Sequence, residues 1–68
     1  MQLEAIRTEI EYMRRQIHRQ RKDIRSLERA GISTKSAEAL LARMLAKVDE
    51  LCAERDRLVG QYRIAKRA

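Results

Sequence analysis

The residues of this chain that could do chemistry are mostly basic, and they gather in the segment 14–29. Seven of its sixteen residues are Arg or Lys, and two are acidic. If the segment is helical, six side chains lie opposite its apolar stripe, and we call them the basic strip: Arg15, His18, Arg19, Lys22, Arg25 and Arg29. Cations on one helix face match a phosphate backbone. The strip is a candidate contact for nucleic acid or another polyanion; the alternative is the solvated outside of a coiled coil.

The chain offers little for catalysis or metal binding. His18 is its one histidine and Cys52 its one cysteine, whereas a structural zinc ion takes four such ligands. No glycine-rich phosphate loop, nucleophile elbow or HExxH pattern is present. We therefore expect no catalytic residue, no cofactor and no metal. We interpret Cys52 as a buried small apolar residue, and His18 as a surface side chain or a phosphate contact.

The net charge of +6 is unevenly spread along the 68 residues. The segment 14–29 carries +5 and the segment 63–68 carries +3, whereas residues 1–13 carry −2 and residues 30–62 balance. Localised positive charge favours an anionic partner more than a diffuse excess does. Nucleic acid and an acidic protein are both partners of this kind.

Apolar residues in the first half of the chain recur at alternating intervals of three and four. They are Leu3, Ile6, Ile10, Met13, Ile17, Ile24 and Leu27. With Leu3 as heptad position a, this is the a/d seam of a coiled coil over four heptads, and Gln20 fills the one polar slot. The absence of proline and the 38% of charged residues are also typical of long helices.

The stretch RAGISTKSAEALL, which begins at Arg29, predicts a reversal of the chain. Gly31 can adopt the left-handed conformation that ends a helix, and Ile32 can then fold back on Leu27. Ser33 is the preferred N-cap of the next helix, with Thr34 a close second. We predict helices over about 2–30 and 34–65 with a turn at about 31–33. One continuous helix of about 100 Å is the alternative.

The helix expected over 34–65 has an apolar face too wide for one neighbour. One stripe runs through the a and d positions, and a second shares the a positions but continues through position e. The residues of the second stripe that we expect in an interface between chains are Leu41, Leu45, Val48, Cys52 and Val59. A helix with two neighbours needs such a face, and the first helix can cover only one stripe. The prediction is a self-associating hairpin.

The expected fold is therefore all-α: one domain over 1–68, an antiparallel two-helix hairpin of coiled-coil type. A dimer of such hairpins forms a four-helix bundle. This layout resembles that of the Rop plasmid copy-number regulators, short helical hairpins that dimerise and bind RNA. The resemblance lies in length and layout and carries no shared motif. It implies a homodimer and RNA binding as expectations.

Two polar residues interrupt the seams, and a hairpin turning at Gly31 predicts what lies across from them. Arg55 falls opposite Glu9, which predicts an ion pair. Gln20 falls near Met44 with no polar partner in its own chain, so we expect its partner to be water or a group across the dimer.

The sequence favours a protein-interaction role in the cytoplasm. The first residues, MQLEAIRTEI, contain early acids and no continuous apolar stretch, so we expect neither a signal peptide nor membrane insertion. Phe and Trp, which anchor interfacial helices, are missing. We expect a non-enzymatic oligomerisation or protein-interaction module. The alternative is a small regulator that contacts the nucleic-acid backbone through its first helix.

Overall fold

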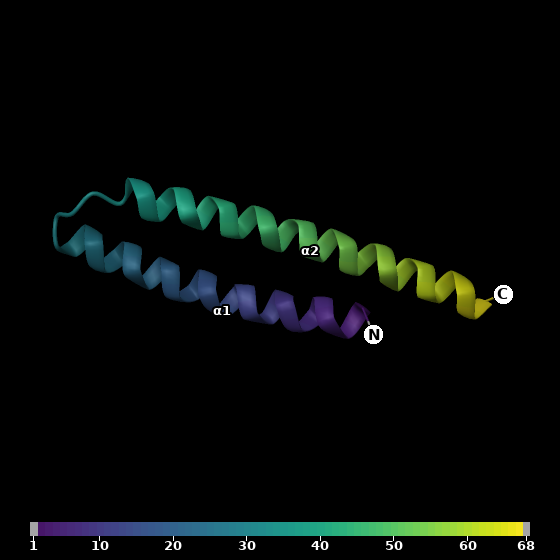
Figure 1. Cartoon of the computed structure of the whole chain (residues 1–68). Helices are drawn as coiled ribbons and strands as arrows, with labels where there is room; N and C mark the ends of the chain where they lie inside the picture. The colour runs from purple at the N-terminus through teal and green to yellow at the C-terminus, as the bar shows by residue number, and fades with distance from the viewer. Residues whose placement is uncertain (1, 68) are drawn as a thin grey trace.

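The chain folds into two long helices that lie side by side and run in opposite directions (Figure 1). The computed structural model describes the backbone of residues 2–67 and the side chains of residues 2–64. Helix α1 spans Gln2–Arg29 and helix α2 spans Lys35–Arg67, with no strand in the described range. The predicted all-α hairpin is confirmed, and both helices begin and end within two residues of the expected positions.

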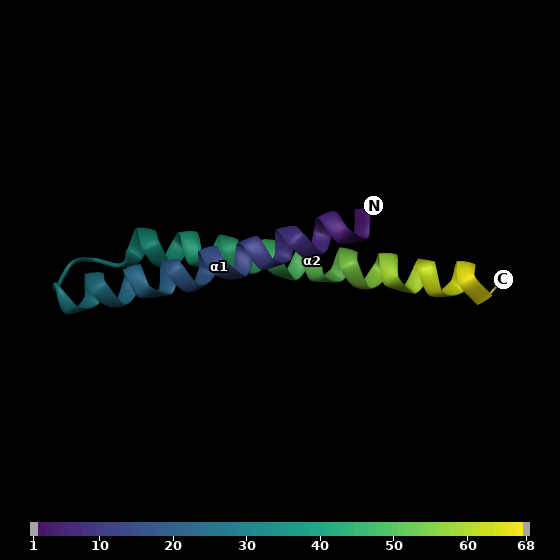
Figure 2. The same cartoon turned by 90° about the horizontal axis from the view of Figure 1, so that it is seen from below.

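The hairpin is a thin rod of 59 × 15 × 12 Å. Helix α2 has 33 residues against 28 in α1, and its C-terminal end extends past the N-terminus of α1 (Figure 1). Seen from below, the two helices cross near the middle of the rod (Figure 2). Such a crossing keeps a stripe with a 3.5-residue repeat facing its partner along helices with 3.6 residues per turn.

Gly31 ends α1 in the left-handed conformation, with φ of 71°. The N–H of Ile32 donates to the carbonyl of Leu27 at 2.9 Å, and the N–H of Gly31 donates to the carbonyl of Glu28 at 3.1 Å. These two bonds form a Schellman motif, which satisfies carbonyls that the helix end would leave free. The predicted reversal at Gly31 is confirmed, although 56% of Ile32 stays exposed.

Helix α2 begins one residue later than a Ser33 cap requires, so the preference for Ser33 as N-cap was wrong. The N–H of Glu38 donates to the carbonyl of Thr34 at 2.8 Å, which makes Thr34 the N-cap. Ser33 Oγ lies 3.5 Å from the N–H nitrogen of Lys35, at the limit of a hydrogen bond. The turn is formed by Ala30 and Gly31, and residues 32–34 then carry the chain across to α2.

The core lies along the two facing stripes. Ile10, Ile17 and Ile24 at the a positions of α1 are buried, as is Leu51 at a d position of α2. No other side chain in residues 2–64 is buried to this degree. The remaining seam residues are half-buried, so the hairpin holds a continuous but narrow core.

Both predictions about polar seam residues were wrong. Gln20 has a partner in its own chain, because its Nε2 donates to the carbonyl of Ala37 at 3.1 Å. Its long side chain reaches past the opposite layer to the first turn of α2. Arg55 pairs with its neighbour Asp56, at 3.1 Å between Nη2 and Oδ1, rather than with Glu9.

Candidate functional site

The two helices meet along two flanks, one on either side of the seam. Gln2 and Gln61, both at heptad position g, line one hollow together with Leu3, Leu58 and Tyr62. The g positions of both helices therefore share one flank. Because e lies on the other side of the a/d seam from g, the e positions of both helices share the opposite flank.

We call this opposite side the e flank. Beyond Glu28 and Glu38, which lie beside the turn, its residues are Arg7, Arg14 and Arg21 from α1 and Leu45, Cys52 and Val59 from α2. The three arginines are exposed, Leu45 is 38% exposed, and Cys52 and Val59 are half-buried. An apolar row of α2 thus borders a basic row of α1 along the flank.

The structure divides the five predicted interface residues between two roles. Leu41 and Val48 lie on the seam stripe and are half-buried. Leu45, Cys52 and Val59 lie beside that stripe on the e flank, where α1 presents arginines to them. All five belong to one continuous face of α2. Their contact with a second chain stays a prediction.

The helices differ in how their apolar residues are distributed. Apolar residues concentrate on one side of α1 and spread around more of α2. The facing side of α1 packs on the seam stripe of α2, and the adjacent row of α2 is partly exposed. This difference matches the two-stripe pattern read from the sequence.

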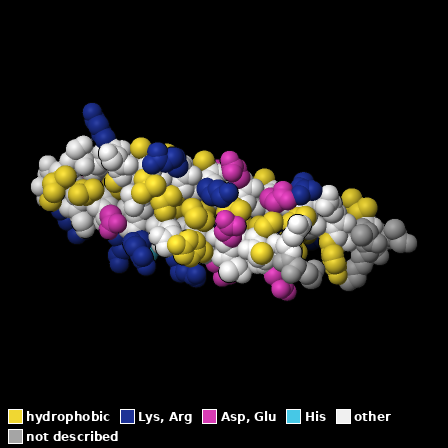
Figure 3. Space-filling model, viewed as in Figure 1, with side chains coloured by type: hydrophobic (Ala, Val, Ile, Leu, Met, Phe, Trp, Pro, Cys, Tyr) yellow, Lys and Arg dark blue, Asp and Glu magenta, His cyan; other side chains and the backbone are white. Residues whose placement is uncertain are grey.

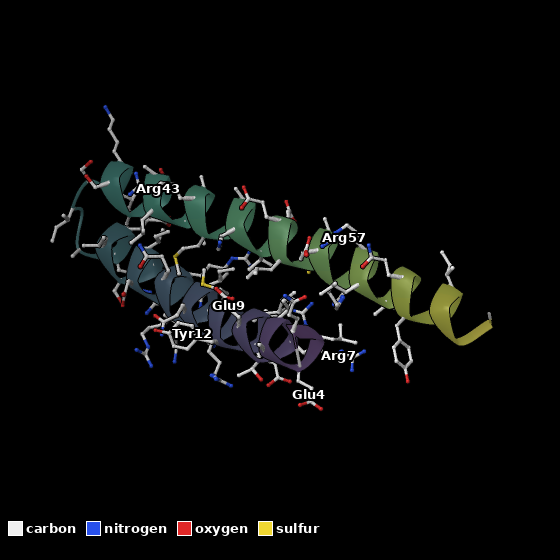
Figure 4. All side chains as sticks on the ribbon, turned by 45° about the vertical axis from the view of Figure 1, so that its right-hand side comes forward. Glu4, Arg7, Glu9, Tyr12, Arg43 and Arg57 are labelled. Atoms are coloured by element: carbon white, nitrogen blue, oxygen red, sulfur yellow. The ribbon has the colours of Figure 1, made fainter. Side chains whose placement is uncertain are left out.

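The g flank and the surface beside it expose further apolar side chains that the sequence pattern did not predict. Leu40 at position g is 41% exposed, and Tyr12, at position c of α1 next to g, is 53% exposed. Figure 3 shows hydrophobic side chains along one face of the hairpin, and Figure 4 shows where Tyr12 and Glu9 lie on α1. The signal for Leu40 was present, because Leu40 and Leu41 are adjacent and therefore point to different sides of the seam.

All six residues of the basic strip are exposed on α1. Four of them, Arg15, His18, Arg19 and Lys22, line a shallow, open hollow of about 440 Å³ together with Arg14. Arg25 and Arg29 lie nearer the turn and outside this hollow. Arg14 was absent from the predicted strip because it occupies an e position. Arg14 lies four residues before His18 and therefore on the same side of the helix, and this spacing could have placed it in the strip.

The cations of the basic strip have no carboxylate partner among the described side chains. The ion pairs among the described side chains join Arg55 to Asp56 and Arg57 to Glu54, and all four residues lie on α2. Figure 3 shows basic side chains gathered along the α1 edge. A polyanion that binds the strip would therefore have no ion pair of the protein to displace, and it would release solvent ions.

Arg57 and Glu54 form a two-bond pair one turn apart on α2. Arg57 Nε donates to Glu54 Oε2 at 3.0 Å, and Arg57 Nη2 donates to Glu54 Oε1. The hydrogen bond from Arg57 lowers the pKa of Glu54, and the bond to Glu54 raises the pKa of Arg57. Both groups face water (Figure 4 labels Arg57), which makes the pair a feature of the surface rather than of a site.

Other kinds of site find no support in the part of the chain that the structure describes. No helix there has the length and apolar character to cross a bilayer. His, Cys, Asp and Glu side chains of residues 2–64 form no group of three that could hold a metal ion. Comparison with known proteins found no matching family model, no similar curated protein and no similar solved structure.

Proposed function

We propose that this chain is a non-enzymatic self-association module, a helical hairpin that pairs with a second copy through the e flank. The observation that carries the proposal is the apolar row of Leu45, Cys52 and Val59, which stays partly exposed beside α1. Removing such a row from water favours association. The simplest product is a four-helix bundle of two hairpins.

The thin core supports the same proposal. Four buried side chains, Ile10, Ile17, Ile24 and Leu51, are few for an independently stable domain. The single Cys52 allows no disulfide within the chain, so another chain is the remaining source of stability. Pairing would extend the core from the seam onto the e flank.

Light scattering on matched variants tests this proposal. Leu45→Glu places a charge on the e flank, and Leu40→Glu places the same charge on the g flank, where the starting exposure is nearly equal. We expect a dimer mass for the wild type and for Leu40→Glu, and a monomer mass with reduced helicity for Leu45→Glu. Equal masses for the two variants would contradict a specific role of the e flank.

A second candidate function is binding of nucleic acid through the basic strip. The hollow lined by Arg14, Arg15, His18, Arg19 and Lys22, with no paired carboxylate, favours it. Contacts of this kind are to phosphates rather than to base edges. Binding is then nearly independent of sequence, and it weakens with salt with a slope of roughly −0.9 per phosphate neutralised on duplex DNA.

Charge reversal separates this second function from nonspecific attraction. Replacing Arg19, Lys22 and Arg25 by Glu should abolish binding of duplex and single-stranded probes while leaving helicity intact, since all three are exposed. The control replaces Lys35, Arg43 and Lys47 on α2 by Glu, with the same change in net charge. Equal loss in both triple variants would mean that net charge, not the strip, binds the probe.

A further inference from the structure

We propose that the two hairpins pair in the same direction, with both turns at one end of the assembly. This inference rests on the proposed self-association through the e flank and adds its orientation. A pair related by a two-fold axis can place its helices in the same direction or in opposite directions. The charges around the apolar row distinguish the two arrangements.

Three rows run along this side of the hairpin. The apolar row of α2 lies in the middle. On one side is the basic row of α1, and on the other is an acidic pair at position b of α2, next to e on the helix surface. The basic row is Arg7, Arg14 and Arg21, and the acidic pair is Asp49 and Asp56. All five charged residues are exposed.

The register of the hairpin aligns these rows. In an antiparallel pair, residues at one level have numbers with a constant sum, and the packing of Gln2 beside Gln61 in one hollow therefore places Arg14 level with Asp49. By the same register, Arg7 is level with Asp56, and Arg21 lies nearer the turn, level with Ala42. Arg14 and Arg7 therefore stand at the levels of the two acids of the pair.

Pairing in the same direction satisfies this pattern. The two-fold axis then runs along the apolar row, so the basic row of each copy faces the acidic pair of the other. Arg14 of one copy faces Asp49 of the second copy, and Arg7 faces Asp56. Opposite charges across an interface select the partner and its orientation.

Pairing in opposite directions brings like charges together. The axis then lies across the rod at Cys52, so Arg14 of one copy faces Arg7 of the other. Asp49 likewise faces Asp56. Such an interface places like charges close together while removing them from water, which is unfavourable.

The groups that would pair are available. The ion pairs among the described side chains leave the basic row and Asp49 unpaired. Asp56 is held by its neighbour Arg55, but the Asp56 side chain is 71% exposed. An exposed ion pair of this kind contributes little, so Asp56 can exchange it for a cation of the second copy.

Oxidative cross-linking tests the orientation. Cys52 lies at the middle of the apolar row, so the wild type should form a disulfide-linked dimer in either direction. In a Cys52→Ser background, Leu45→Cys faces its own equivalent only in the same-direction pair. In the opposite-direction pair it faces residue 59, so only a mixture of Leu45→Cys and Val59→Cys proteins would cross-link. Leu40→Cys in the same background is the control on the g flank.

We expect the Leu45→Cys and Val59→Cys proteins each to cross-link alone, and Leu40→Cys not to. Cross-linking only in the mixture would overturn the orientation while leaving self-association intact. A monomer mass of the wild type by light scattering, with no Cys52 disulfide, would overturn both proposals.

Reversing one charge should change the dissociation constant of the dimer in opposite directions for the two arrangements. Arg14→Asp should raise the dissociation constant of a same-direction dimer, because Arg14 faces Asp49 there. In the opposite-direction dimer it would place an acid opposite Arg7 instead of two arginines opposite each other, and so lower that constant. Adding Asp49→Arg to Arg14→Asp should restore the same-direction dimer. A tighter Arg14→Asp dimer by analytical ultracentrifugation would overturn the proposal.

Discussion

Gly31 and Gly60 are the two glycines of the chain, and their backbone conformations differ. Gly31 has φ of 71°, whereas Gly60 is helical, and a Cβ added at either would meet no atom within 4 Å. Substitution therefore acts through backbone conformation alone. Gly31→Ala should lower the free energy of unfolding by about 1–2 kcal/mol, because L residues disfavour positive φ. Gly60→Ala should raise it by about 0.5–1 kcal/mol.

Urea unfolding of the wild type, both alanine variants and Gly31→Asn at one protein concentration checks this contrast. Gly31→Asn should lose less stability than Gly31→Ala, since Asn tolerates the left-handed conformation better. Equal effects of alanine at the two positions would contradict the conformational explanation.

At the surface of α2, the predicted effect of pH concerns Glu54. Arg57 lowers the pKa of Glu54 through its hydrogen bond. A carboxylate whose pKa is lower in the folded state stabilises the fold above its unfolded pKa, and this contribution is lost as the pH falls through its folded pKa. Replacing Arg57 by Gln should raise the pKa of Glu54 toward its ordinary value. NMR titration of the Glu54 carboxyl carbon measures this directly, and an unchanged value would refute the assignment.

Between the two helices, Gln20 makes a hydrogen bond at a seam position where an apolar side chain would bury more apolar surface. Gln20→Ala removes the bond to the Ala37 carbonyl and leaves the seam layer underfilled, so it should lower the free energy of unfolding by about 1 kcal/mol. Gln20→Leu restores the apolar seam and should raise it by about 1 kcal/mol. Thermal unfolding of both variants tests the sign. A loss of stability in Gln20→Leu would mean that the hydrogen bond outweighs burial.

The helices and their reversal could be predicted from the sequence because the signals are local. Spacing of three and four marks the seam, and Gly31 marks the end of α1. The cap of α2 could not be settled locally, because the choice between Ser33 and Thr34 depends on how many residues cross between the helices. The partner of Gln20 depends likewise on the reach of a side chain across the packed pair.

The candidate surfaces, like the helices, could be predicted from the sequence in part. The basic strip follows from helical spacing, and its residues are exposed as that spacing requires. The grouping of Arg14 with His18, and the exposure of Tyr12 and Leu40, depend on the shape of the packed surface. That the arginine row of α1 borders the apolar row of α2 follows from which flanks the two packed helices share.

For the whole molecule, the thin core predicts that folding and association are coupled. The unfolding midpoint of the wild type should rise with protein concentration, because a second copy binds the folded state and stabilises it by mass action. Circular dichroism at two concentrations tenfold apart measures the effect. Leu45→Glu, which charges the e flank, should have a lower midpoint that does not change with concentration. A concentration-independent midpoint in the wild type would contradict coupled folding.

The position of the two helix ends away from the turn also determines how the rod responds to mechanical load. The N-terminal end of α1 and the C-terminal end of α2 lie at the same end of the hairpin, and the turn lies at the other (Figure 1). A force that pulls these two ends apart acts across the seam, so the layers separate one after another, beginning near Leu3 and Leu58 and finishing at the turn. A force applied between the turn and that end acts along the helices and strains every layer at once. The hairpin should therefore unzip at low force and resist stretching along its length.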